Sequence, residues 1–434
     1  MSLLQLLLYM LGQFGIMLLT RYLFQWTLRF SDTPTETGPL FLASIVGAVF
    51  LGYRIFDGIT DPMAGGLADW WVSRGRKRTS LLMLSFWIAP VGLVMCFVPD
   101  ESMSPLVRWV LLVTGMFVFF VGYTIYAIPY WSLVEDYGRA WPEGRRLLSN
   151  MLGLGLILAT IVGFVVTPLL IHQFGYRDGA AVVAILAMGC MVAPVYAGRL
   201  AQADEQLPHR ESVSLGAIIR SFGKVFKNRR FVALMTLLAG SQMSFTVLTA
   251  AAPYIAIQLL NGTDKDVSLL LGPLIVTALP MFAFAPAVSR RFGWEHALIG
   301  TSVLLGGVYC LTASITGMSL VGSAKVTAML VFSCAGPMIA VLLALDAEAI
   351  TACVGSDEKG AVSMYFGVYN LVIKTLNGVA LFLTGLLVDL ANGSWGATAV
   401  RLMLVLAALL LFTGVTLSGL IRRGFSSPPE PARQ

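Results

Sequence analysis

Long apolar segments recur along the whole chain of 434 residues. A helix needs about 18 or more mostly apolar residues to cross the hydrocarbon core of a bilayer, and the chain repeatedly reaches that length. Charged residues make up only 12% of the sequence, whereas soluble domains carry about 25%. The chain therefore has too few charges to cover a water-facing surface. This pattern predicts an all-α integral membrane protein.

The apolar runs and their polar breaks predict twelve transmembrane helices. The first contains Arg21 and lacks both a basic start and a cleavage site, so we expect a helix rather than a signal peptide. The expected spans are 3–28, 40–66, 79–98, 106–134, 147–171, 179–198, 231–257, 267–288, 296–316, 323–350, 361–389 and 397–421.

A long polar segment near the middle of the chain divides these helices into six and six. We expect an N-terminal bundle over 1–198, a cytoplasmic linker over 199–230, a C-terminal bundle over 231–421 and a tail over 422–434. Apolar residues three and four apart among basic ones predict an amphipathic helix within the linker. Paired six-helix bundles of this kind bind their substrate near the middle of the membrane.

Basic residues gather in alternate loops, for example at 74–78, 139–146 and 220–230, while the opposite loops are acidic. The positive-inside rule then places both termini in the cytoplasm, which requires an even number of spans. We expect a bacterial inner membrane and a monomer. The formal charge of +6 is explained by this topology, so no nucleic-acid partner is predicted.

Three charged residues lie on one face of the predicted second helix. Arg54, Asp57 and Asp61 are spaced three and four apart, so they face the same direction. Two carboxylates one turn apart in an apolar site need a compensating cation, which can be a metal ion, a proton or a basic side chain. Thr60 could add a hydroxyl ligand for Na⁺. The alternative is a purely structural Arg–Asp pair.

Two further charges fall inside predicted spans, where charges are costly and usually functional. Lys374 needs an anionic partner, for which the carboxylates of the second helix are candidates, either as a coupling switch or as a permanent salt bridge. Arg21 has no carboxylate within one turn. It either contacts an acidic group on the substrate or bonds to Asp346 or Glu348.

Enzyme signatures are missing from the sequence. The three histidines fall in loops or at helix ends, and no zinc-protease, nucleophile-elbow or phosphate-loop motif occurs. The five cysteines lie mostly in apolar runs and are not expected to form disulfides. We predict a protein that is not an enzyme and has no cofactor other than a coupling ion.

Four features together resemble the glycoside–pentoside–hexuronide cation symporter family, the melibiose-permease type within the major facilitator superfamily. They are the segment from Arg54 to Gly65, the basic run from Arg74 to Arg78, the segment from Tyr123 to Leu133, and Lys374. The resemblance covers nearly the whole chain. It implies the major facilitator fold, cation binding by Asp57, Asp61 and Thr124, substrate packing on Trp131, and a place for Lys374 near the cation.

The chain also departs from the sugar permease of that family. Thr60 replaces an asparagine, so both Na⁺ and H⁺ stay open as coupling ions. Met17 and Ala127 replace two carboxylates that bind sugar hydroxyls, which argues against a galactoside. The vertebrate lysolipid symporters resemble the same family and also lack that pair.

These observations predict a secondary transporter that carries a small polar solute, such as a sugar or sugar acid, by cation-coupled symport. The alternative is a transporter or flippase of an amphipathic anion such as a lysophospholipid. The coupling residues are Lys374 and Arg54. The predicted cation ligands are Asp57, Thr60, Asp61 and Thr124, and the predicted substrate-binding residues are Arg21, Tyr123, Trp131, Tyr365, Tyr369 and Asn370.

Overall fold

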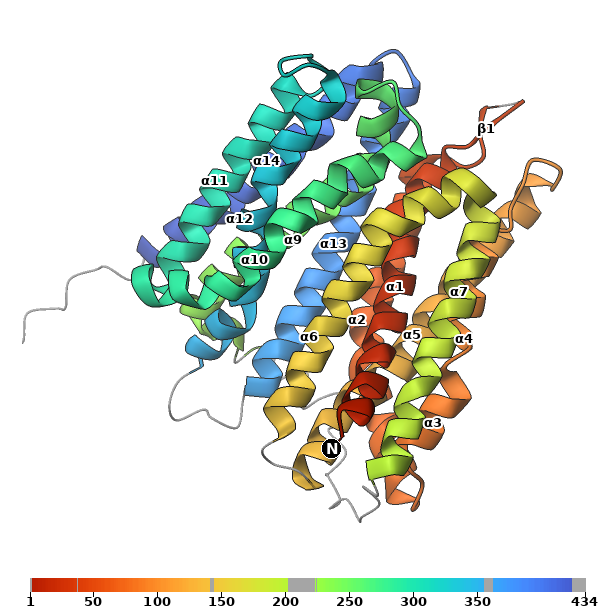
Figure 1. Ribbon diagram of the computed structural model, residues 1–434, viewed down its shortest axis with the longest axis vertical. Helices are drawn as coiled ribbons and strands as arrows, with labels where there is room; N and C mark the ends of the chain where they lie inside the picture. The colour runs from red at the N-terminus through yellow and green to blue at the C-terminus, as the bar shows by residue number, and fades with distance from the viewer. Residues whose placement is uncertain are drawn as a thin grey trace, which may run out of the picture. The chain divides into compact units, whose positions relative to one another are not determined.

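The computed structural model describes residues 2–36, 38–140, 144–201, 223, 225–354 and 362–423. Nearly all of them are helical (Figure 1). The α-helices are α1 (Leu3–Ser31), α2 (Ala43–Ser73), α3 (Arg78–Ser85), α4 (Ile88–Cys96), α5 (Pro105–Ala140), α6 (Arg145–Ile161), α7 (Thr167–Ala201), α9 (Arg229–Tyr254), α10 (Val267–Phe292), α11 (Trp294–Ile315), α12 (Ala324–Ala352), α13 (Val362–Asn392) and α14 (Gly396–Arg423).

Short irregular elements join or extend these helices. The π-helical turns η2 (Val162–Val166) and η3 (Ile255–Leu259) continue α6 and α9, and the 3₁₀ turn η4 (Asp264–Asp266) precedes α10. Strands β1 (Pro34–Thr35) and β2 (Gly38–Pro39) form an antiparallel pair.

Eleven of the described segments are long and apolar enough to span a membrane. One of them, Leu147–Ala197, has 51 residues and would be about 76 Å long as a straight helix, more than twice the hydrocarbon thickness. Gly175 breaks it with a φ of 77°, a conformation that glycine adopts without a steric penalty. This segment therefore supplies two spans, and the described helices match the twelve that the sequence predicts.

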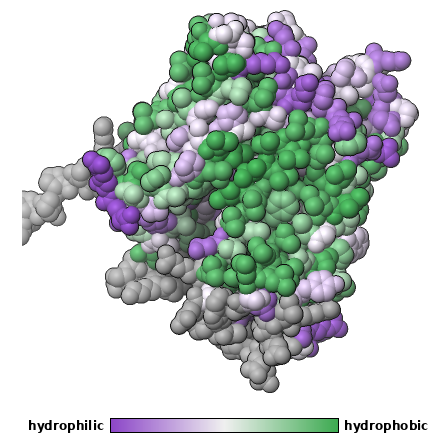
Figure 2. Space-filling model, viewed as in Figure 1, coloured by the Kyte–Doolittle hydropathy of each residue, from purple (hydrophilic) through white to green (hydrophobic). Residues whose placement is uncertain are grey.

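Large apolar side chains cover the outside of the helices. Leu106, Val276 and Ile185 are 74%, 68% and 66% exposed, which suits contact with lipid rather than water. Figure 2 shows hydrophobic residues gathered over the middle of the helices on one face and hydrophilic residues gathered near the helix ends. This distribution confirms that the chain is a multi-pass membrane protein.

The chain divides into two compact units. Unit 1 contains residues 1–213 and 261–272, and unit 2 contains 214–260 and 273–434. The linker helix expected within 199–230 falls mostly on 202–222, and the tail falls mostly on 424–434; both stretches lie outside the described residues.

Helix α1 forms the centre of unit 1, where it packs chiefly on α6 and α7. Two of its buried aromatic side chains bond to α7. Trp26 donates from Nε1 to the Thr167 hydroxyl at 2.9 Å, and the Tyr22 hydroxyl donates to the Tyr176 carbonyl at 2.6 Å. Each polar tip is thus satisfied inside the apolar bundle. The contacts fix the rotation of α1, which carries Arg21.

Unit 2 is built around the crossing of α9 and α14. At one end of it, Glu295 of α11 accepts from Arg230 at 3.0 Å and from Arg422 at 2.8 Å. Arg401 donates to the carbonyls of Ala313 and Thr316 near the end of α11, where helical carbonyls have no intrahelical partner.

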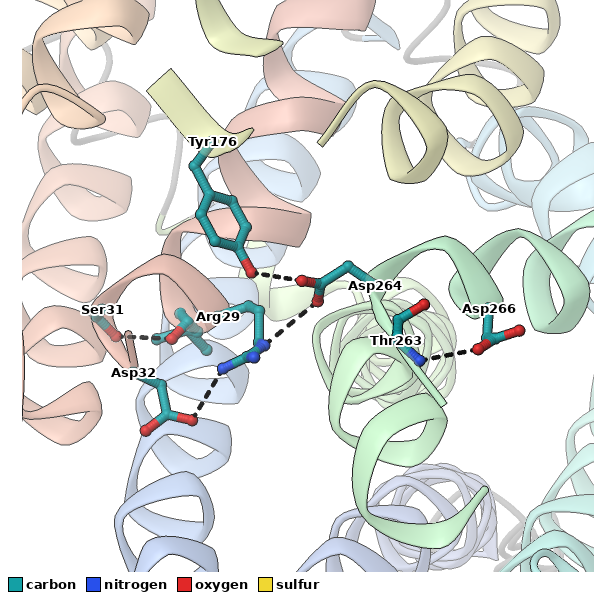
Figure 3. A network of polar contacts seen from close by, with 8 residues as sticks. Arg29, Ser31, Asp32, Tyr176, Thr263, Asp264 and Asp266 are labelled. Carbon is teal, nitrogen blue, oxygen red and sulfur yellow. Dashed lines mark hydrogen bonds and ion pairs between the residues drawn. The ribbon is translucent and has the colours of Figure 1, made fainter. Parts of the chain in front are cut away.

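The segment 261–272 packs as part of unit 1, although the chain before and after it belongs to unit 2. Figure 3 shows how it is fastened. Asp264 accepts from Arg29 of α1 at 3.4 Å and from the Tyr176 hydroxyl of α7 at 3.0 Å. Arg29 also pairs with Asp32 at 3.3 Å. This ion-pair network holds η4 against α1 and α7.

Candidate transport site

The carboxylate of Asp57 is the centre of the predicted cation site in unit 1. Its side chain is 0% exposed, and Oδ2 accepts from Arg54 Nη1 at 2.9 Å. The two residues are three apart on α2, so the pair follows from helical spacing. The Arg54 guanidinium also lies 5.0 Å from the centre of the Phe24 ring of α1, a cation–π distance. Arg54 therefore joins α2 to α1.

The second carboxylate oxygen of Asp57 is held from another helix. Thr124 of α5 donates its hydroxyl to Asp57 Oδ1 at 3.0 Å, and Thr124 is buried. The resemblance names both residues as cation ligands, and the structure brings them together. Thr60 differs, because its hydroxyl donates to the carbonyls of Phe56 and Asp57 in its own helix, at 3.0 and 3.2 Å.

Tyr123 lies near the charged residues that the sequence assigns to the site in unit 1. Its ring is 7% exposed, and its phenol interacts electrostatically with Asp57, Asp61, Arg54 and Arg21. Helices α1, α2 and α5 thus direct their charged and polar side chains to the same region. The sequence places these residues on separate helices, and the bundle unites them.

Trp131 lies two turns after Tyr123 on α5. The two rings meet edge to face with centroids 6.4 Å apart, and Trp131 donates from Nε1 to Gln13 Oε1 of α1 at 2.8 Å. Both rings therefore belong to the interior of unit 1 and are not turned to lipid. Gln13 joins these two rings as the hydrogen-bond acceptor of Trp131. In the sequence its only distinguishing feature is a polar side chain inside an apolar run.

Arg21 lies against the π-helical turn η2. Its guanidinium is 5.5 Å from the centre of the Phe164 ring, and a Cβ at Gly163 would come within 2.8 Å of Arg21 Cβ. Glycine at 163 is what lets the arginine pass so close. The rival partners proposed for Arg21 have bonds inside unit 2: Asp346 accepts from Gln242 and Tyr369, and Glu348 accepts from Ser289.

The remaining predicted residues belong to α13 of unit 2. Tyr365 is buried and its hydroxyl accepts from Asn228 at 3.1 Å. Tyr369 is 8% exposed and donates to Asp346 at 2.8 Å. Asn370 is exposed and Lys374 is partly buried. The predicted site residues thus form one group in unit 1 and another in unit 2.

One protein family matches almost the whole chain. A family model described as MFS/sugar transport protein matches residues 40–418. The chain belongs to this family. It is a secondary transporter of the major facilitator type, with the all-helical fold that the sequence predicts, and it is not an enzyme.

A curated relative in Bacillus subtilis (strain 168), "Uncharacterized symporter YjmB", is 24% identical over 272 residues. The match covers 60% of this chain and 57% of the relative, so it spans little more than half the relative's length. That protein is a symporter by name.

Solved structures of similar fold cover nearly the entire chain. The nucleoside transporter NupG has a TM-score of 0.67 at 14% identity, covering 98% of this chain and 100% of that one. A bacterial homologue of the human lysosomal transporter Spinster has a TM-score of 0.66 at 15% identity, covering 98% and 96%. A peptide transporter, POT, has a TM-score of 0.69 at 12% identity, covering 96% and 94%. These likenesses establish the fold.

Proposed function

We propose that this transporter is a cation-coupled symporter of a small polar solute, such as a sugar or sugar acid, that works by alternating access. One observation carries the coupling: the fully buried Asp57 carboxylate has one oxygen on Arg54 and the other on Thr124. A carboxylate withdrawn from water inside a membrane protein is costly. A carboxylate in such a position is therefore expected to have a function that requires its charge.

The coupling ion competes with Arg54 for Asp57. Arg54 neutralises the carboxylate, so Na⁺ bound by Asp57 and Asp61 would have to displace the guanidinium from Oδ2, and protonation of Asp57 would weaken the same pair. Thr124 keeps Oδ1 oriented and offers a hard oxygen of the kind Na⁺ prefers. Release of Arg54 is then the local event through which the ion acts, with Lys374 as a second coupling residue.

The substrate is expected to contact the residues gathered around Tyr123. The rings of Tyr123 and Trp131 suit the C–H face of a sugar, and the indole is already oriented by Gln13. Arg21 suits an acidic group because guanidinium binds carboxylate in a two-pronged grip. The family description as sugar transport protein supports a sugar-like substrate, and the name of the symporter relative supports symport.

Uptake into vesicles reconstituted with the purified protein tests this function. We expect accumulation of D-glucuronate, D-galacturonate, D-xylose or D-glucose that requires a Na⁺ or H⁺ gradient. Asp57→Asn should abolish accumulation while the protein stays folded, because the isosteric amide cannot hold the coupling ion. Accumulation by Asp57→Asn at the wild-type level would refute the assignment of Asp57.

The alternative substrate is an amphipathic anion, and one feature favours it. Ala127, at a position where the sugar permease has a carboxylate, is fully buried, so an apolar group fills that place. Lysophosphatidylcholine and lysophosphatidylglycerol therefore belong in the same assay. Transport of a lysolipid, with no response to any sugar or uronate, would replace the polar solute by the amphiphile.

A further inference from the structure

Unit 2 contains a carboxylate in a membrane-spanning helix that the coupling mechanism does not use. Asp346 lies on α12, and its Oδ2 accepts from Gln242 Nε2 of α9 at 2.9 Å and from the Tyr369 hydroxyl of α13 at 2.8 Å. Gln242 and Tyr369 also interact with each other. The three side chains thus form a closed polar triangle between three helices.

The charge of this triangle is not balanced from within. Among the described residues Asp346 has no ion pair, and both of its donors are neutral. A carboxylate kept in a membrane span without a cation beside it is costly and therefore rare. A buried charge whose ion-pair partner has been removed is costly for the same reason. A purely structural link between α9, α12 and α13 could be made by neutral groups at a lower cost.

The hydrogen bonds of the triangle leave two acceptor atoms unused. Both donors go to Asp346 Oδ2, so Asp346 Oδ1 bonds to no described residue, and neither does Gln242 Oε1. Buried side-chain oxygens that lack a partner occur elsewhere in the described residues, but these two are not among them. Since they have no partner among these residues, they are accessible rather than buried. Two accessible acceptors, held in place by internal donors, call for a ligand that supplies two donors.

We propose that Asp346, Gln242 and Tyr369 form a hydroxyl-binding site on unit 2, at which two neighbouring hydroxyl groups of the transported solute donate to Asp346 Oδ1 and Gln242 Oε1. The proposal rests on the proposed transport of a polar solute. It assigns to unit 2 a carboxylate for substrate hydroxyls. The positions of Met17 and Ala127 in unit 1, where the resemblance implies such carboxylates, carry none.

Hydroxyl binding predicts how the isosteric variant fails. In Asp346→Asn the amide can still accept from Gln242 and Tyr369 through its oxygen, but its NH₂ then stands where Oδ1 stood. A substrate hydroxyl that must donate there meets a donor. Because hydrogen bonds to charged groups are strong, we expect binding to weaken about 10- to 100-fold.

The experiment compares wild type, Asp346→Asn and Glu348→Gln by thermal stabilisation and by uptake. The probes are D-glucuronate, D-galacturonate, D-xylose and D-glucose, followed by monodeoxy analogues of whichever sugar binds. Glu348 is the matched control, because it is a carboxylate two residues away on α12 whose side chain accepts from Ser289 and is exposed. We expect Glu348→Gln to bind like the wild type.

The deoxy analogues separate recognition from a structural effect. Removing the hydroxyl that donates to Asp346 should weaken binding to the wild type about 10-fold or more, and should make little difference to Asp346→Asn, which has already lost that bond. Asp346→Asn should also keep the wild-type dependence of uptake on Na⁺ and pH, because coupling belongs to Asp57.

Three results would overturn the proposal. The first is wild-type affinity in Asp346→Asn with altered pH dependence, which would make Asp346 a proton site. The second is unchanged affinity with lower thermal stability in the absence of sugar, which would make it structural. The third is displacement of the bound sugar by an amine such as spermidine as effectively as by the sugar itself. If the wild type binds no sugar at all, the proposed function fails, and this site with it.

Discussion

Asp57 is held by two donors of different character. The bond from Arg54 is charge-assisted and comes from the same helix, whereas the bond from Thr124 is neutral and comes from α5. A cation competes with the first donor and cooperates with the second, because a hydroxyl oxygen can serve as a cation ligand while a guanidinium repels the ion. Mutation of the two contacts should therefore change Na⁺ binding in opposite directions.

Substitution of these two donors gives a prediction of sign. Arg54→Gln should tighten binding of the coupling ion about tenfold, the equivalent of roughly 1.4 kcal/mol, because the ion no longer has to displace a guanidinium. Thr124→Val should weaken Na⁺ binding by a similar factor because it removes a ligand oxygen, whereas it should strengthen H⁺ binding because the ionised Asp57 carboxylate loses a donor. The measurement is the concentration of Na⁺, or the pH, at half-maximal uptake in each variant.

Thr384→Val is the control, because that buried hydroxyl donates only to the Ala380 carbonyl of its own helix. Thr384→Val should leave the Na⁺ concentration, or the pH, at half-maximal uptake unchanged. Weaker ion binding in both Arg54→Gln and Thr124→Val would contradict the competition, since it would make Arg54 a support of the site.

The sequence could predict the contacts that depend on helical spacing and could not predict those between helices. The Arg54–Asp57 pair is three residues apart, so helical geometry alone foresees it. The bond between Trp131 and Gln13 spans 118 residues, and nothing in either segment specifies the other. Thr124 was expected near Asp57 through the family resemblance, and the polar triangle around Asp346 was not expected.

Helix boundaries were more accessible to prediction than helix contacts. Apolar length determines where a chain can span a membrane, so the expected spans 323–350 and 267–288 lie close to α12 and α10. Local backbone chemistry explains the differences. Phe86 and Trp87 interrupt the single helix expected over 79–98, and Gly175 turns the chain where a longer loop was expected.

The packing of α9 on α14 depends on two glycines. A Cβ at Gly240 would lie 2.5 Å from the Leu410 carbonyl oxygen, and a Cβ at Gly414 would lie 2.8 Å from that of Thr236. Such contacts with backbone cannot be relieved by turning a side chain. Small residues of this kind let membrane helices approach closely.

Gly240→Val should therefore destabilise unit 2 by about 1–3 kcal/mol, the usual cost of overpacking a close interface. Gly419→Val is the control, because Gly419 lies on the partner helix α14 and a Cβ there would meet nothing within 4 Å. Thermal unfolding of the two purified variants provides the comparison. Equal stability of both would show that α9 and α14 can separate at no cost.

At the scale of the whole molecule, the segment 261–272 is attached in two ways. Its packing belongs to unit 1 through Asp264, whereas its chain continues into unit 2 at both ends. At the first junction Asn261 has a φ of 49°, two residues after the end of η3. At the second junction Pro273 lies within α10 and cannot donate a hydrogen bond to the helix. Irregular residues at element ends are where moving parts of proteins bend. Transport by alternating access moves parts of the protein relative to one another, so these junctions are the expected hinges.

The last prediction concerns the fastening of this segment. Asp264→Asn removes the ion pair with Arg29, whose side chain is 18% exposed, as against 20% for Asp264. Because solvent screens a partly exposed ion pair, the contact between the segment and unit 1 should lose only about 1 kcal/mol of stability. We expect amide hydrogen exchange across 261–272 to rise several-fold. Maximal transport rate should also rise, with unchanged apparent affinity for substrate and ion, because the segment resists the motion less.

Lys265→Gln alters the exposed neighbouring residue and should change neither quantity. If exchange rises in Asp264→Asn while the transport rate stays the same, the segment is fastened to unit 1 without limiting the transport cycle.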